Sequence, residues 1–384
     1  MRRVALVITS LGSSRRGGGA ARALTILANR WQAEGQAVRI FSLADPVDRP
    51  CFPLNDRIDV VALGGPASGG LLSRAIRVCR RVIHLRTGLR EFRPDVIVSF
   101  LTGANVQAIF ASRGLGVPVI VSERTDPHRH PVPTPYGTLR TLTYPWANAI
   151  VVQTEAAARY FPPALRSKIA VIPNAILPGS RPKDTHRERA DALLSVGHLG
   201  SPKDHRTLVE AVARLKESHP ALTLTIYGEG PERGMLVDLV RTRGLESRVR
   251  LPGFTAGIAE RLRNFDLFLF SSRYEGFPNA LGEAMSAGLP VIASDGPGNQ
   301  ELVRDRVNGR VFPAGDVAAL ASIIAELHGD RAGREALAQA ARGASDTFSV
   351  ARVAALWDDV FSGFGGLRKT VVDTPTRSGS GSGA

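Results

Sequence analysis

Residues 271–285 read SSRYEGFPNALGEAM and hold two glutamates, Glu275 and Glu283, eight positions apart. The apolar run at 265–270 predicts a buried strand before them, and the run at 288–295 predicts a turn and another strand after them. A Gly-Phe-Pro loop and the start of a helical segment lie between the two carboxylates. The N-terminus of a helix that follows a strand presents free backbone N–H groups and a positive dipole end to a phosphate. An anion at these amides, with a hydroxylated group at each carboxylate, describes a nucleotide sugar.

Short apolar runs alternate with helical patterns along the whole chain, which predicts parallel sheets covered by helices on both faces. We expect strands at 4–9, 38–42, 59–63, 96–100, 117–122, 149–153 and 169–172, and again at 192–196, 222–227, 249–251, 267–270, 291–293 and 309–312. We expect helices between them, among others at 20–34, 72–85, 203–218, 231–243 and 317–328. The predicted fold is α/β, with two doubly wound, Rossmann-like halves that face each other across a cleft. Ligands of such sheets bind at the carboxyl ends of the strands.

The length of 384 residues exceeds that of an ordinary single core and predicts two domains. The turn-rich, polar stretch 178–185 is the expected boundary. The predicted division is an acceptor-side domain at 1–178, a nucleotide-sugar-binding domain at 190–361 and a disordered tail at 362–384.

The bulk composition is that of a soluble globular protein, with 43% hydrophobic residues. Two distant cysteines, Cys51 and Cys79, do not form a disulfide framework and favour a reducing cytoplasm. The run at 4–9 predicts a first core strand rather than a signal peptide, because it passes directly into a glycine loop. The net charge of +14 implies an anionic partner. We expect no nucleic acid, because only 6% of the residues are aromatic and no nucleic-acid module is recognisable.

In this setting Glu275 and Glu283 resemble the paired glutamates of the retaining glycosyltransferases of family four, which have the GT-B fold. The resemblance implies that Glu275 contacts the donor sugar and takes part in catalysis, without a metal ion or other cofactor. The sequence contains no Asp-x-Asp motif. An ionised carboxylate accepts two hydrogen bonds, so Glu283 suits a pair of ribose hydroxyls. The diphosphate is expected at the amides of three residues, Asn279, Ala280 and Leu281.

Residues 195–205, SVGHLGSPKDH, resemble the family segment that brings two cations to the donor diphosphate. Lys203 matches the family's lysine and would neutralise the leaving group as the glycosidic bond breaks. His198 stands where the family usually has arginine, and a neutral imidazole carries no charge. We therefore expect either that the diphosphate keeps His198 protonated or that another basic residue compensates.

The glycine-rich loop at 10–24 follows the first strand and opens the first helix. Glycines let the backbone approach a ligand closely, and Gly18 and Gly19 are the candidate donor contacts. The loop resembles the family's Gly-Gly-Ala-Glu-Arg signature, with Ala21 in place of the glutamate. It lacks the spaced G-x-G-x-x-G pattern of nicotinamide-binding folds.

The candidate acceptor-side residues are Asn105, Glu123 and Arg124, which follow first-half strands and would line the cleft. This region resembles a bacterial branch that extends lipid-linked glycans. The family's nearby histidine is missing, although His128 and His130 are close. Loop capping and turn chemistry are the alternative roles for all three candidates. In the second half, the turns at 226–231 and 251–254 are expected to shape the uracil pocket, again by resemblance.

A basic helix is predicted around 72–83, with Arg74, Arg77 and Arg81 on one face. Three apolar or weakly polar residues favour the other face, namely Ile76, Cys79 and Ile83. Such a helix can lie on anionic lipid, and the alternative is a solvated face on a core helix.

Together these features predict a cytoplasmic glycosyltransferase, with peripheral attachment to the inner face of the plasma membrane as a further expectation. It would move a sugar from a nucleotide donor, expected to be UDP-linked, to a hydroxyl of a polysaccharide or a polyprenyl-diphosphate glycan. An anionic membrane surface is a further candidate partner. Three alternatives stay open at this point: a sugar-nucleotide epimerase or phosphorylase on the same fold, a non-catalytic GT-B partner subunit, and a nucleic-acid-binding protein suggested by charge alone.

Overall fold

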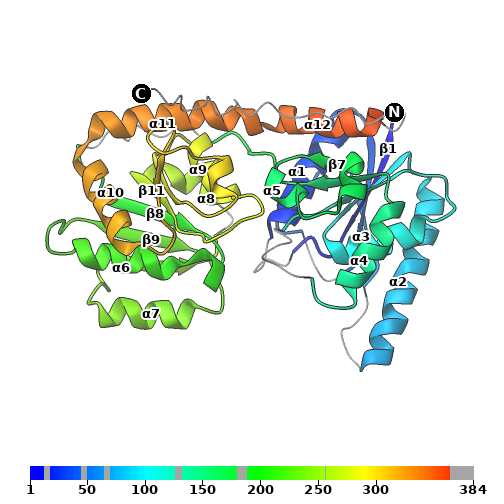
Figure 1. Cartoon of the computed structure of the whole chain (residues 1–384), viewed down its shortest axis with the longest axis horizontal. Coiled ribbons are helices and arrows are strands. Elements are labelled where there is room, and N and C mark those ends of the chain that lie inside the picture. The colour runs from blue at the N-terminus through cyan, green and yellow to red at the C-terminus, as the bar shows by residue number, and fades with distance from the viewer. Residues whose placement is uncertain are drawn as a thin grey trace, which may run out of the picture.

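The computed structural model describes residues 1–12, 18–44, 50–64, 70–125, 132–179, 188–255 and 257–363. Figure 1 shows two α/β lobes side by side. Every strand pairing within the two sheets is parallel. The predicted fold is therefore confirmed, and each of the predicted strands overlaps an observed one.

The first lobe is built on a seven-stranded sheet with the order β3-β2-β1-β4-β5-β6-β7 within the described residues. Its strands are β1 (Arg3–Ile8), β2 (Ala37–Ser42), β3 (Asp59–Ala62), β4 (Val96–Phe100), β5 (Val119–Ser122), β6 (Ala149–Val152) and β7 (Ile169–Val171). Its helices are α1 (Gly19–Ala33), α2 (Leu71–Phe92), α3 (Thr102–Ser112), α4 (Tyr136–Thr143), η1 (Tyr144–Trp146), α5 (Glu155–Ala158) and η2 (Pro163–Lys168). Two apolar clusters hold helices against the two faces of the sheet, because each face of a parallel sheet must be buried.

The second lobe is built on a six-stranded sheet with the order β10-β9-β8-β11-β12-β13. Its strands are β8 (Ala192–Val196), β9 (Thr223–Tyr227), β10 (Val249–Gly253), β11 (Leu267–Phe270), β12 (Val291–Ser294) and β13 (Arg310–Phe312). Its helical elements are η3 (Ser201–Lys203), α6 (His205–Leu215), α7 (Arg233–Thr242), α8 (Ile258–Arg261), η4 (Leu262–Asn264), α9 (Asn279–Ser286), η5 (Asn299–Glu301), α10 (Val317–Gly329), α11 (Arg331–Ser345) and η6 (Asp346–Phe348). In the first sheet the strand order reverses between β1 and β4, and in the second sheet it reverses between β8 and β11. Folds of this kind bind their ligands at such a reversal of strand order.

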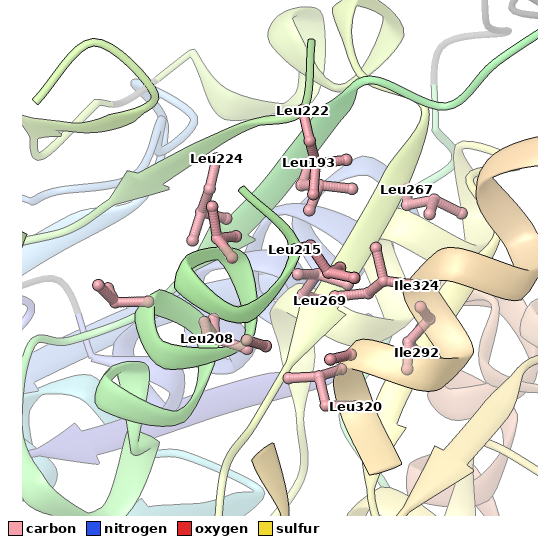
Figure 2. Packing of buried hydrophobic residues seen from close by; sticks show 14 of the residues in the cluster. Leu193, Leu208, Leu215, Leu222, Leu224, Leu267, Leu269, Ile292, Leu320 and Ile324 are labelled. Atoms are coloured by element: carbon pink, nitrogen blue, oxygen red, sulfur yellow. The ribbon is translucent and has the colours of Figure 1, made fainter. Parts of the chain in front are cut away.

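The core of the second lobe forms where α6 and α10 cover one face of its sheet. Figure 2 shows leucines of α6, such as Leu208 and Leu215, beside strand residues Leu193 and Leu269 and beside Ile324 of α10. All of these side chains are fully or almost fully buried. This packed face fixes the strand ends whose loops carry the candidate site.

The last helix, α12 (Val350–Ser362), departs from the predicted domain at 190–361. It packs against the first lobe, where the ring of Trp357 lies 6.1 Å from that of Trp31 and 6.0 Å from that of Phe100. Figure 1 shows α11 and α12 running along one side of both lobes. The apolar face of α12 needs a core to bury it, and the side of the first lobe that α1 covers supplies one. The predicted tail beyond Gly363 and most of the predicted boundary lie outside the described residues.

Among the described helices, none combines the length and the apolar character that crossing a bilayer requires.

Candidate functional site

A cavity of about 1000 Å³ lies between the two lobes, at the carboxyl ends of the central strands. The second lobe contributes the loops after β8, β9, β10 and β11 and the start of α9. The first lobe contributes the start of α1, segment 50–54 and the ends of β4, β5 and β6. Of the predicted residues, the cavity is lined by Gly18, Gly19, Arg124, His198, Lys203, Glu275, Asn279, Ala280 and Glu283. The structure thus brings together residues that lie far apart in the sequence.

Glu275 is held from several sides in the loop between β11 and α9. The hydroxyl of Ser272 donates a hydrogen bond to its Oε1 over 2.6 Å, and the ammonium of Lys203 donates to the same oxygen. Its backbone N–H donates to the carbonyl of Pro297. The neighbouring Gly298 has a φ of +90°, and a Cβ there would lie 2.6 Å from the carbonyl oxygen of Glu275. The side chain of Glu275 is therefore fixed at the cavity wall.

Lys203 ends the short helix η3, and Asp204 then turns the chain with a φ of 49° before α6 begins. The predicted helix from Lys203 is therefore broken at this turn. The carboxylate of Asp204 accepts from Arg273 over 3.1 Å, which ties the turn to the loop of Glu275. Behind it, burial lowers the pKa of His205 to about 3, and the charges of Lys203 and His198 lower it further. His205 is thus neutral at physiological pH and adds no charge beside Lys203.

The N-terminus of α9 faces the cavity through Asn279 and Ala280, whereas Leu281 is fully buried. The side chain of Leu281 belongs to the core of the second lobe, so only its backbone amide can serve the predicted role.

Glu283 receives an ion pair from the opposite lobe that the sequence did not predict. Nη2 of Arg22 lies 2.7 Å from its Oε1. Burial raises the pKa of Glu283, and the charge of Arg22 opposes this effect. The feature of the sequence that could have identified Arg22 is the glycine-rich loop, because Arg22 lies one helical turn beyond Gly18. Arg22 is a second cation in the cavity, at the carboxylate expected to bind ribose.

A chain of hydrogen bonds crosses the cavity floor from the first lobe to the start of α9. Arg124 donates to Oδ1 of Asn174 over 2.7 Å, and Nδ2 of Asn174 donates to Oδ1 of Asn279 over 2.8 Å. A Cβ on Gly19 would lie 2.7 Å from Nδ2 of Asn279. Asn174 was not predicted from the sequence. It fixes the side-chain amide of Asn279 at the start of α9.

The three predicted acceptor-side residues have different places in the structure. Arg124 lines the cavity, and its guanidinium lies 4.8 Å from the ring centre of Phe100. Burial lowers the pKa of Arg124 to about 9. Asn105 and Glu123 are buried inside the first lobe and are not among the described residues that line the cavity.

The placement of Asn105 and Glu123 at the cleft was wrong. Both side chains lie between α3 and η1. There the hydroxyl of Tyr144 accepts a hydrogen bond from Asn105 and donates one to Glu123. Glu123 also accepts from the hydroxyl of Thr102, and burial raises the pKa of its carboxyl. The sequence shows that a polar residue follows a strand end, but it does not show the direction of its side chain. Here the side chains of Asn105 and Glu123 form hydrogen bonds with buried polar groups.

The end of the cavity formed by the second lobe is shaped by β8 and β9. Gly228 has a φ of +147°, and a Cβ there would lie 1.8 Å from the carbonyl oxygen of Gly197, so only glycine fits. Tyr227, Phe254 and the exposed His198 line this part. An aromatic and apolar wall beside polar backbone suits a nucleotide base.

Parts of two predicted motifs, residues 13–17 and the histidines His128 and His130, lie outside the described residues. Within the described part of the chain, no group of three or more histidine, cysteine, aspartate or glutamate side chains is placed to hold a metal ion. Metal independence stays a prediction.

Comparison with known proteins places each half of the chain in a glycosyltransferase family. Residues 18–175 match the family described as "Glycosyl transferase 4-like domain", and residues 179–344 match "Glycosyl transferases group 1". A Campylobacter jejuni enzyme is 24% identical over 93% of this chain and 97% of its own length. Its name is GalNAc-alpha-(1->4)-GalNAc-alpha-(1->3)-diNAcBac-PP-undecaprenol alpha-1,4-N-acetyl-D-galactosaminyltransferase.

Other relatives match over shorter segments. The putative glycosyltransferase EpsD of Bacillus subtilis is 33% identical over 48% of each chain. The chain spans half or less of the length of the first curated relatives that it matches. The crystal structure of Anabaena Alr3699/HepE in complex with UDP and glucose superposes with a TM-score of 0.75 at 21% identity, over 94% of this chain and all of the other.

These matches cover both lobes and agree with the fold and with the glutamates and lysine that line one cavity. The chain belongs to the GT-B-fold glycosyltransferases.

Proposed function

We propose that this protein transfers a sugar from a UDP-linked donor to a hydroxyl of a glycan acceptor, with retention of configuration and without a metal ion. The observation that carries the proposal is the convergence of Lys203, Glu275, Glu283 and the N-terminus of α9 on one cavity. These groups are a cation, two carboxylates and the positive end of a helix, which together complement a diphosphate flanked by two hydroxylated rings.

The residues have distinct roles in this proposal. Glu283 accepts hydrogen bonds from the ribose, and the amides of α9 with Lys203 bind the diphosphate. Glu275 positions the donor sugar. The bond between the anomeric carbon and the phosphate oxygen breaks as the acceptor oxygen bonds to that carbon, and the acceptor proton passes to the departing phosphate oxygen. Stabilisation of the developing charge by Lys203 is the electrostatic contribution that usually dominates.

In this proposal Arg22 supplies the positive charge that the family's arginine would bring at the position of His198. In the structure Lys203 is paired with Glu275 and Arg22 with Glu283. A bound diphosphate offers both cations a stronger anionic partner, and it frees the carboxylates for hydroxyl groups. Arg22 is then the second cation at the diphosphate.

The acceptor is a glycan, and a polyprenyl-diphosphate glycan is the form we favour. The name of the Campylobacter jejuni relative, which matches nearly the whole chain, gives an undecaprenol-linked glycan. The epimerase, phosphorylase and partner-subunit alternatives are not favoured, because both halves match glycosyltransferase domains.

Nucleotide binding is the first test. We expect UDP, but not GDP or ADP, to raise the thermal midpoint of the wild type. A ligand at about a hundred times its dissociation constant stabilises the folded state by roughly 2.7 kcal/mol. Lys203→Ala and Glu283→Ala are expected to abolish the shift, because each removes a charged contact to the ligand.

The matched controls are Lys216→Ala and Glu217→Ala, two exposed residues of the same lobe, which should keep the full shift. In sugar transfer from UDP-linked donors, Lys203→Ala should lower kcat by roughly a hundredfold or more. Proton NMR of the new linkage then reports its configuration. A wild type that no nucleotide stabilises would overturn the proposal.

A further inference from the structure

Two helices begin at the same place in the cavity, one from each lobe. Helix α1 begins at Gly19 and α9 begins at Asn279, and both residues line the cavity. No described side chain caps either helix start. A Cβ on Gly19 would lie 2.7 Å from Nδ2 of Asn279, so the two starts are in contact. The positive ends of two helix dipoles therefore meet at the side-chain amide of Asn279, where an anion is favoured.

The side chain of Asn279 offers a hydrogen-bond donor at this meeting point. Its Oδ1 accepts from Nδ2 of Asn174 over 2.8 Å. Its own Nδ2 has no acceptor within the described part of the chain, and Asn279 lines the cavity. An amide N–H in this position can donate to an oxygen of a bound ligand.

The orientation of this amide is set from the first lobe. Nη1 of Arg124 donates to Oδ1 of Asn174 over 2.7 Å. A guanidinium only donates hydrogen bonds, so the atom of Asn174 that faces it must be the oxygen. Nδ2 of Asn174 then faces Asn279 and needs an acceptor, which Oδ1 of Asn279 supplies. We call these two hydrogen bonds the amide relay, and they leave the N–H groups of Asn279 for the cavity.

Arg124 is held in place at the start of the amide relay. Its guanidinium lies 4.8 Å from the ring centre of Phe100 and 5.7 Å from that of Trp357. The side chain is buried, and its Nε and Nη2 are closed off from solvent without a hydrogen-bond partner. These two nitrogens therefore do not reach a ligand in the cavity. The guanidinium acts on the cavity through Asn174.

We propose that Asn279 donates a hydrogen bond from Nδ2 to the diphosphate of the donor, and that Arg124 and Asn174 are positioning residues that keep this N–H turned to the cavity. The inference rests on the proposed function, because it requires a nucleoside diphosphate in the cavity. It assigns Arg124 to the donor, whereas the sequence predicted an acceptor-side residue. A rotated Asn279 would present Oδ1 to the phosphate oxygens, and two acceptors repel each other. Uridine has no phosphate, so its affinity does not depend on the amide relay.

Asn174→Asp reverses the orientation of the Asn279 amide and keeps the shape of the substituted side chain. Both oxygens of a carboxylate accept, so one accepts from Arg124 and the other from Nδ2 of Asn279, whose Oδ1 then faces the ligand. We expect UDP to bind at least about tenfold more weakly, because repulsion replaces a hydrogen bond to a charged group. Uridine should bind as it does to the wild type. Titration calorimetry with UDP and with uridine measures both affinities.

Arg124→Met removes the donor that orients Asn174 and keeps an unbranched side chain beside Phe100. The amide of Asn174 can then turn either way, so the orientation of Asn279 is no longer fixed. We expect UDP to bind about twofold to tenfold more weakly, as for the loss of one neutral hydrogen bond. The affinity for uridine should again stay at the value of the wild type.

A double-mutant cycle separates the orientation of the amide from the added negative charge. Asn279→Ala alone removes the donor and should weaken UDP binding. In that background Asn174→Asp should have little further effect, because no amide remains to rotate. The matched control is Asn148→Asp, at an exposed residue of the same lobe whose Oδ1 accepts from the backbone of Val119. It adds the same charge and should leave both affinities unchanged.

Affinities for UDP and uridine that fall in parallel would overturn the inference, because the variants would then have distorted the cavity as a whole. It would also be overturned by Asn174→Asp binding UDP as the wild type does, or by a loss that persists in full in the double variant. In each of these cases the wild type binds UDP, and the proposed function stands. A wild type that does not bind UDP overturns both.

Discussion

The buried carboxyl of Glu123 makes the stability of the protein depend on pH. Burial raises its pKa above the ordinary value of 4.5, so the folded state holds the proton more tightly than the unfolded state does. Its stabilising contribution is complete below that ordinary value and is lost as the pH rises through the folded pKa. Glu123→Gln cannot ionise, so its free energy of unfolding should gain on that of the wild type from about pH 5 to about pH 8, by roughly 1.4 kcal/mol for each unit of pKa shift.

Urea unfolding at the two pH values measures this difference. Glu217→Gln is the control, because it makes the same substitution at a side chain that is 89% exposed. If Glu123→Gln behaves in the same way as this control, the carboxyl is ionised at no cost and the buried network with Tyr144 has been misjudged.

The position of single residues could be predicted where a local motif determines it. Glu275 and Glu283 were placed at the cavity from the loop and helix start between them, and Lys203 from the family resemblance of residues 195–205. Arg22 and Asn174 could not be found in this way, because their partners Glu283 and Asn279 lie more than a hundred residues away. The misplacement of Asn105 and Glu123 has a related cause, since the sequence does not show which way a side chain turns at a strand end.

At the scale of elements, the contact between α1 and α9 makes Gly19 sensitive to substitution. A Cβ at this position would lie 2.7 Å from Nδ2 of Asn279, so Gly19→Ala must rotate that amide and break its hydrogen bond to Asn174. Loss of one such bond costs roughly 0.5–1.5 kcal/mol of stability, which the higher helix propensity of alanine in the first turn of α1 offsets by about 1 kcal/mol. The displaced Asn279 should weaken UDP binding severalfold.

Gly234→Ala is the matched control, in the first turn of α7 with nothing within 4 Å of the added Cβ. Titration calorimetry with UDP compares the two variants with the wild type. Equal affinities for all three proteins would mean that the orientation of Asn279 does not matter to the ligand.

The strands and helices could be predicted well from the sequence, because each buried strand of a parallel α/β sheet appears in it as a short apolar run between helical patterns. The helix α12 shows where this reasoning stops. Its amphipathic pattern identifies a helix but not the core that receives it, and the ring of Trp357 lies among first-lobe residues Trp31 and Phe100. Helix α12 thus returns from the second lobe to the first and covers part of its core.

For the whole molecule, a few polar contacts join the two lobes around the cavity. Arg22 pairs with Glu283, Asn174 bonds to Asn279, and a Cβ on Gly276 would lie 2.6 Å from Oε1 of Gln153. Breaking the ion pair is costly, because burial of the Glu283 carboxylate is unfavourable without its cation. The relative position of the lobes should therefore respond to Arg22.

We expect Arg22→Ala to separate the lobes when no ligand is bound. The uncompensated carboxylate of Glu283 can regain water only if the cavity opens, so the radius of gyration from small-angle X-ray scattering should increase. UDP should bind more weakly, because the second cation is missing. Arg30→Ala removes another arginine from α1, one that pairs with Glu34 of its own segment, and should leave both quantities unchanged. An unchanged radius with weakened UDP binding would mean that Arg22 serves the ligand but does not hold the lobes together, whereas unchanged values of both would remove Arg22 from the site.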